Sequence, residues 1–225
     1  MFVVNWKCHK NRKPIYMLLY VDDMLLAYES MTEIARVKRL LNLEFEMKDL
    51  GHAKKILGME ITKNRKEKVL YLSQVDYLKR VLERFNLKGA KSITIPLAQH
   101  FKLSKEQEPK SDEDIAYMQK VPNASVVGSI MYFMVCCIPD ISYSMSVVSR
   151  FMANPGKRHW ETAKLVLRYI SGTIDVGLKY VNRGDVPIIE GYVDSNFVGS
   201  NDTRKSTIGY AFKVFGNLVS WRANL

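Results

Sequence analysis

The chain has 225 residues, of which 47% are hydrophobic and 25% charged, a composition typical of folded globular proteins that excludes disorder and low-complexity repeats as its main state. Its 34 Lys and Arg residues outnumber its 23 Asp and Glu residues, so the formal net charge is +11. Such a charge favours a polyanionic partner, either nucleic acid or an anionic membrane surface; the alternative is a basic protein without one.

Cysteine usage, the first residues and the apolar runs indicate an intracellular protein. Three Cys residues, two of them adjacent, form no CxxC motif, and the four His residues have no ligand spacing, so we expect neither a disulfide framework nor a zinc site. Residues 1–7 become basic too early for a signal peptide. The longest apolar run, 124–138, is shorter than the about 20 residues of a membrane span. We therefore predict no membrane contact and a cytoplasmic or nuclear location.

The first part of the chain predicts two β-hairpins with a helix between them. Apolar runs at 14–20 and 24–28 flank an Asp-rich connection, which is a hairpin signal. Residues 31–46 carry apolar side chains at helical spacing. Strand-like segments at 55–62 and 69–73 then enclose a polar turn.

A basic helix is expected after the second hairpin. Ser73 and Asp76 have the spacing of a capping box, and Gly89 is expected to end the helix. Between residues 31 and 91, 15 Lys and Arg residues stand against 8 Asp and Glu residues, which is more than half of the net charge. We predict that exposed cations of this helix contact nucleic-acid phosphates; the alternative is a solvated helix face. These cations are Lys79, Arg80, Arg84 and Lys88.

The remaining segments predict a linker, a helical region and a small β-meander. Residues 92–121 are charged and poor in aliphatic side chains. Helical spacing extends over 122–173, and strand patterns follow from 174 onward. They lie at 178–181, 188–193, 209–215 and 218–221. Helices and antiparallel strands that are separated along the chain predict an α+β fold.

The string Tyr20-Val21-Asp22-Asp23 is the sharpest candidate site. Adjacent carboxylates at a hairpin tip repel each other unless water or a cation neutralises them, and Mg²⁺ prefers carboxylate oxygens. Cations held between such carboxylates carry out phosphoryl transfer in two-metal enzymes. An ordinary Asp-rich turn is the alternative, and the string alone does not decide between the two.

Motifs along almost the whole chain, from about Ile15, resemble those of copia-type LTR-retrotransposon reverse transcriptases. The string LLYVDDML at 18–25 resembles the catalytic hairpin of that family. Further segments follow in the order of the family: FEMKDLG at 45–51, ILGMEI at 56–61, LSQ and YL within 72–78, SITIPL at 92–97, VGSIMY at 127–132, PDI at 139–141 and FMANPGKRHW at 151–160. GYVD at 191–194, RKSTIGY at 204–210 and VSW at 219–221 resemble the opening strands of its RNase H domain.

The resemblance implies roles for three carboxylates. Asp22 would be a metal ligand of the polymerase site with Asp23 as its neighbour, and Asp194 would be the first metal ligand of an RNase H site. The implied cofactor is Mg²⁺. The implied partners are a template–primer duplex, an RNA–DNA hybrid and the remaining parts of a Pol polyprotein.

The resemblance also implies a division of the chain. Residues 1–91 would form the C-terminal part of the palm, the primer-grip hairpin and the start of the thumb. A linker at 92–121 would lead to thumb and connection helices at 122–173, and 174–225 would be a truncated RNase H-like domain.

The sequence departs from the family pattern in ways that bear on activity. The family's polymerase site needs a further upstream Asp and its RNase H site needs further downstream carboxylates, and we find neither. Asn196 stands where many relatives have Asp, and Ile138 where many have Arg. We therefore expect a Pol fragment that is inactive alone. The alternatives are a non-catalytic nucleic-acid-binding remnant and a translated pseudogene.

Overall fold

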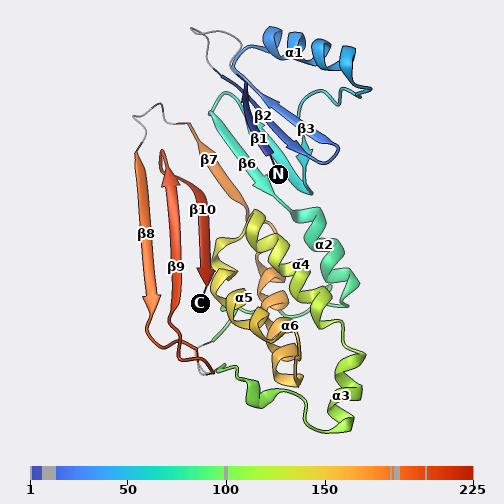
Figure 1. Ribbon diagram of the computed structural model, residues 1–225, viewed down its shortest axis with the longest axis vertical. Helices are drawn as coiled ribbons and strands as arrows, with labels where there is room; N and C mark the ends of the chain where they lie inside the picture. The colour runs from blue at the N-terminus through green and yellow to red at the C-terminus, as the bar shows by residue number, and fades with distance from the viewer. Residues whose placement is uncertain are drawn as a thin grey trace. The chain divides into compact units, whose positions relative to one another are not determined.

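The computed structural model describes the backbone of residues 2–6 and residues 14–98, 101–182, 184, 188–200 and 202–224. They fall into two compact units, Met1–Leu57 and Gly58–Leu225, whose elements are shown in Figure 1. Helices and antiparallel sheets are both present, which confirms the predicted α+β class. The four-part division of the chain stays a prediction. No helix among the described residues is long and apolar enough to cross a membrane.

The first unit contains a three-stranded antiparallel sheet in the order β1-β2-β3. Its strands are β1 (Phe2–Trp6), β2 (Ile15–Tyr20) and β3 (Asp23–Ala27). The predicted hairpin is confirmed, because β2 pairs with β3 in register. Helix α1 (Met31–Glu44) buries Ile34 and Val37, and the two-residue strand β4 (Lys55–Ile56) ends the unit.

The second unit begins with the hairpin of β5 (Met59–Asn64) and β6 (Val69–Ser73). The single strand expected at 55–62 is wrong, because Leu57 and Gly58 have φ angles of 49° and 70° and form a turn. Strand β7 (Leu178–Val181) pairs antiparallel with β6, and the two lie side by side in Figure 1. We expected this segment in the C-terminal meander, and that placement is also wrong.

Helix α2 (Val75–Arg84) begins after the buried Gln74, but not with the predicted capping box. No side chain of the N-cap residue closes the helix. Instead, Glu60 of β5 accepts from the backbone N–H of Asp76 at 3.1 Å and from the Ser73 hydroxyl at 3.3 Å. A carboxylate at a helix N-terminus satisfies an unpaired donor and favours the helix dipole.

The same helix ends earlier than predicted. Asn86, not Gly89, takes the left-handed position that closes it, with φ 56°. The Leu87 N–H donates to the Leu82 carbonyl at 2.8 Å and the Asn86 N–H to the Glu83 carbonyl at 3.1 Å. This hydrogen-bond pair is a Schellman motif, in which Asn is the usual substitute for Gly.

The helical region is confirmed, and its apolar side chains form the core. Its α-helices are α3 (Asp112–Gln119), α4 (Asn123–Cys136), α5 (Ser142–Val148) and α6 (Lys157–Gly172), with short 3-10 turns at Lys105–Gln107, Pro139–Ile141 and Ser149–Phe151. Helix α3 and one 3-10 turn lie inside the segment expected to be a linker. Leu78 of α2 packs in one cluster with residues such as Phe133, Met145 and Leu167. Each such fully buried side chain stabilises the fold by about 1.5–3 kcal/mol.

A buried histidine fastens the start of α6. His159 is 1% exposed; its Nδ1 accepts from the Gly156 N–H at 2.8 Å, and its Nε2 donates to the Ser104 carbonyl at 3.1 Å. Its ring stacks on Phe151 with centroids 4.1 Å apart. Burial lowers the pKa of this imidazole. The neutral ring matches the two hydrogen bonds, because one ring nitrogen accepts and the other donates.

The C-terminal strands form a separate antiparallel sheet in the order β10-β9-β8. They are β8 (Ile189–Asn196), β9 (Thr207–Val214) and β10 (Asn217–Asn224), which confirms the meander for these three. The indole N–H of Trp221 on β10 donates to the Met134 carbonyl of α4 at 3.1 Å. Arg150 reaches the hydroxyl of Thr207 at 3.3 Å. One side of this sheet is thereby fixed to the helices.

Candidate functional site

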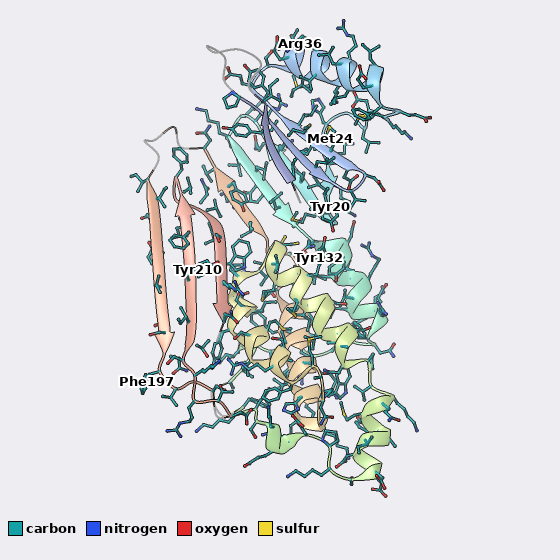
Figure 2. The ribbon with its side chains drawn as sticks, in the orientation of Figure 1. Tyr20, Met24, Arg36, Tyr132, Phe197 and Tyr210 are labelled. Atoms are coloured by element: carbon teal, nitrogen blue, oxygen red, sulfur yellow. The ribbon has the colours of Figure 1, made fainter. Side chains whose placement is uncertain are left out.

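The tip of the β2–β3 hairpin presents the two candidate carboxylates. Tyr20 pairs with Asp23 across the hairpin, so Val21 and Asp22 alone form the turn. Both carboxylates are exposed, and Tyr20, 44% exposed, marks the end of β2 in Figure 2. The apolar strands on either side make the hairpin, and the hairpin places both Asp side chains at its surface as predicted.

The turn itself is strained at Val21. Val21 has φ 49°, whereas Asp22 does not have positive φ, which is the pattern of a type II′ turn. Glycine usually occupies this first central position, and a side chain with a Cβ costs roughly 1–2 kcal/mol there. The chain therefore keeps a β-branched residue, 79% exposed, where the hairpin alone would favour glycine.

The described residues do not contain a complete set of ligands for Mg²⁺. The two carboxylates are ligands of the kind that Mg²⁺ prefers, but this cation requires near-octahedral coordination by about six oxygens. Among the described residues no group of three His, Cys, Asp or Glu side chains could hold a metal ion. Asp22 and Asp23 are thus brought together, while a complete donor set is not.

Asp194 lies in β8, the strand at the edge of the small sheet. It pairs with Gly209 of β9, which in turn pairs with Ala223 of β10, so its neighbours across the sheet carry no charge. All residues of β8 are exposed, and Phe197 just beyond the strand is 86% exposed (Figure 2). Among the described residues, Asp194 belongs to no group of three or more His, Cys, Asp or Glu side chains that could hold a metal ion.

Helix α2 presents three of the four predicted cations on its exposed side, and Lys88 lies just beyond its C-terminal end. Lys79, Arg80, Arg84 and Lys88 are exposed, whereas Leu78, Val81 and Leu82 are buried. The helix is held by Tyr77, whose hydroxyl donates to the Ser129 carbonyl at 3.1 Å and whose ring meets Tyr132 edge-on at 5.3 Å. The basic face is therefore fixed to the core.

The four cations differ in their availability. The Lys88 ammonium lies 2.7 Å from the Glu83 carboxylate, and this hydrogen bond raises the pKa of Lys88 and lowers that of Glu83. Arg84 lies over the Phe85 ring, 5.5 Å from its centroid. Within the described part of the chain, Lys79 and Arg80 have no ion-pair partner, so they are the most available for phosphates.

A fourth carboxylate, Asp140 of the PDI motif, has a structural partner. The Tyr169 hydroxyl donates to the Asp140 carboxylate. Burial, followed by this hydrogen bond, raises the pKa of Tyr169 to about 12. The contact joins the turn after α4 to α6, and the sequence pattern contained no signal for it.

The chain thus combines an acidic hairpin tip and a basic helix in an α+β fold. A family model described as reverse transcriptase (RNA-dependent DNA polymerase) matches residues 4–99. The Pol polyprotein of transposon TNT 1-94 from Nicotiana tabacum is 49% identical over 99% of this chain, which covers 17% of that polyprotein. The Pol polyprotein of transposon RE1 from Arabidopsis thaliana is 32% identical over 94% of this chain, which covers 14% of it.

A shorter relative matches over most of its own length. An uncharacterized mitochondrial protein of Arabidopsis thaliana is 33% identical, and the match covers 93% of this chain and 82% of that protein. No solved structure matches. The chain belongs to the copia-type retrotransposon reverse transcriptases, and it spans less than a fifth of the length of the Pol polyproteins that it matches.

Proposed function

We propose that this chain forms one side of a reverse-transcriptase active site and is inactive by itself. The observation that carries the proposal is the two-residue turn that exposes Asp22 and Asp23 side by side. Their carboxylates would hold Mg²⁺ together with ligands from another segment of the polymerase. Bound Mg²⁺ would supply charge stabilisation for nucleotidyl transfer. Since two carboxylates are an incomplete donor set, no catalytic step is assigned to the isolated chain.

The finer division follows the family resemblance. The hairpin of β5 and β6 would belong to the primer grip and α2 to the thumb. Strands β8 to β10 would open an RNase H-like domain, with Asp194 in its first strand. Three successive antiparallel strands with a carboxylate on the first support this assignment. An intracellular location, in the cytoplasm or the nucleus, belongs to the same proposal.

A second role, binding of duplex nucleic acid without catalysis, is favoured by α2. Its exposed cations are fixed to the core through Tyr77. Cations on a rigid helix contact phosphates without reading sequence. The substrates in this proposal are a template–primer duplex and an RNA–DNA hybrid, and the partners are the remaining parts of the Pol polyprotein.

Primer extension tests the catalytic proposal. The isolated chain should extend no primer, whereas the chain fused to the upstream reverse-transcriptase segment of the TNT 1-94 polyprotein should extend one. Asp22→Asn should abolish extension by the fusion. Asp175→Asn removes one charge from an exposed Asp that is not part of the hairpin and should leave extension unchanged.

Two results would overturn the proposal. Extension by the isolated chain that is lost on Asp22→Asn would mean that other residues here complete the metal site. Undiminished extension by the fusion carrying Asp22→Asn would remove Asp22 from the active site.

A further inference from the structure

A cavity of about 600 Å³ lies in the second unit, away from the cationic face of α2. We call it the turn cavity, because its wall comes from the β5–β6 turn, the end of β7 and the β9–β10 turn. Its volume is within the range of about 300–1,000 Å³ that is usual for ligand sites. No motif of the sequence pointed to it, because three distant segments build it.

The charged side chains of the turn cavity all have the same sign. Lys63, Arg65 and Lys68 line it, and no Asp or Glu is among the lining residues. None of the three cations has an ion-pair partner within the described ranges. Three unneutralised cations around a concave surface raise the local potential and attract anions.

Two aromatic side chains also line the cavity. Tyr180 of β7 and Phe215 of the β9–β10 turn line the cavity; Tyr180 is half-buried and Phe215 is 40% exposed. Aromatic faces beside cations suit a ligand with both phosphate and base. Stacking on an aromatic ring combined with a basic groove is how proteins hold single-stranded nucleic acid.

Hydrogen bonds hold the walls in place. The Asn217 side chain pairs with both backbone groups of Val181: its Oδ1 accepts from the N–H at 2.7 Å and its Nδ2 donates to the carbonyl at 3.0 Å. Asn64 accepts from the N–H groups of Lys66 and Glu67 at 3.1 and 3.2 Å. The cavity is therefore preformed, which lowers the entropy lost on binding.

Two lining residues occupy backbone conformations that their side chains disfavour. Lys68 has φ 56° and Phe215 has φ 52°. Phe215 and Gly216, with φ 71°, together form the turn between Val214 and Asn217, which is the type I′ pattern that prefers Asn-Gly. Strained residues persist where function requires them, and here both strained side chains face the same cavity.

We propose that the turn cavity binds single-stranded nucleic acid, with phosphates against Lys63, Arg65 and Lys68 and one base stacked on Phe215. Its cations belong to the β5–β6 hairpin that the proposed function assigns to the primer grip, so the inference rests on that assignment and extends it to a single strand and to the β9–β10 turn. Binding in the turn cavity needs neither Asp22 nor Mg²⁺.

Binding of a fluorescent oligothymidylate to the full chain tests the proposal. Phe215→Asn removes the ring and creates the Asn-Gly pair that the turn prefers, and an unfolding midpoint at or above that of the unchanged chain shows that lost binding is not lost folding. We expect this variant to bind about tenfold more weakly. The triple variant Lys63→Gln, Arg65→Gln and Lys68→Asn should lower the salt slope by about 2, since each phosphate contact on a single strand contributes about 0.7.

The matched control removes three exposed lysines outside the cavity, Lys102→Gln, Lys110→Gln and Lys120→Gln, and should leave the salt slope unchanged. Equal slopes for the cavity triple and this control would overturn the proposal, as would undiminished binding by Phe215→Asn. Inorganic phosphate that displaces the oligonucleotide at equal phosphate concentration would also overturn it, because the site would then bind phosphate alone. Failure here leaves the primer-extension test untouched, since that test depends on Asp22.

Discussion

The hairpins β2–β3 and β9–β10 both reverse on two residues, but they place different chemistry at the reversal. Each holds a bulky side chain at positive φ, Val21 in one and Phe215 in the other. The first turn exposes carboxylates, whereas the second brings an aromatic ring to a cavity lined by cations. A tight turn positions whatever side chains it carries, and both of these turns keep residues that are poor choices for the backbone alone.

Substitutions in the two turns should differ most in their effect on catalysis. In the fusion with the upstream polymerase segment, Asp22→Asn should lower primer extension by about a hundredfold or more, because a misplaced or missing ligand disrupts the geometry of transfer. Phe215→Asn in the same fusion should leave the rate of single-nucleotide addition unchanged. A comparable loss in both variants would show that the two turns act in one process.

Duplex binding distinguishes the cations of helix α2 from those of the turn cavity. Replacing Lys79, Arg80 and Arg84 with Ala should lower the salt slope for a duplex by up to about three. Filter binding over a salt series measures this slope. The cavity triple should change duplex binding less than the α2 triple does, and the reverse order would contradict the assignment of duplex contacts to α2.

Stability should reveal the strain that the two turns share. Val21→Gly and Phe215→Asn each place the residue that the respective turn prefers, so each should stabilise the protein by about 1 kcal/mol. Thermal unfolding should then shift upward by about 2–4 °C. A lowered midpoint in either variant would mean that the replaced side chain contributes more through packing than it loses through strain.

The smallest expected effect concerns pH and depends on neither turn. Burial lowers the pKa of His159 below its ordinary 6.5, so the unfolded chain binds a proton more readily than the folded one does. Folding stability should be complete above pH 6.5 and decline as the pH falls below that value. Urea midpoints measured across this range test the effect. His159→Asn should flatten the profile, and an unchanged slope would assign the pH dependence to other groups.

Local patterns were enough to predict most elements but not their long-range partners. The apolar runs at 14–20 and 24–28 with the Asp-rich connection between them predict the β2–β3 hairpin, because each interaction there lies within a few residues. The pairing of β7 with β6 has no local signal, since it depends on where the intervening helices lead the chain. The Asn86 cap was recognisable in principle, as Asn is the usual alternative to Gly at this position.

The candidate site, like the fold, was predicted from the sequence only where its residues are close along the chain. The exposure of Asp22 and Asp23 follows from the hairpin and was predicted. The capping of α2 by Glu60 and the grouping of Lys63, Arg65 and Lys68 with Phe215 were not, because they join side chains from separate strands. Sequence patterns show which residues are unusual, but tertiary structure decides which of them meet.

The bond pair between Asn217 and Val181 has a consequence for the exchange of backbone hydrogens with solvent. The amide proton of Val181, at the end of β7, is held by a side chain that begins β10. The protection of this amide proton against exchange therefore depends on two features. One is the sheet to which β7 belongs, and the other is the β9–β10 turn, which must stay closed to hold Asn217 in place. Exchange at this one position reports local opening of a neighbouring cooperative unit, so a ligand in the turn cavity should slow it before any global change in stability is seen.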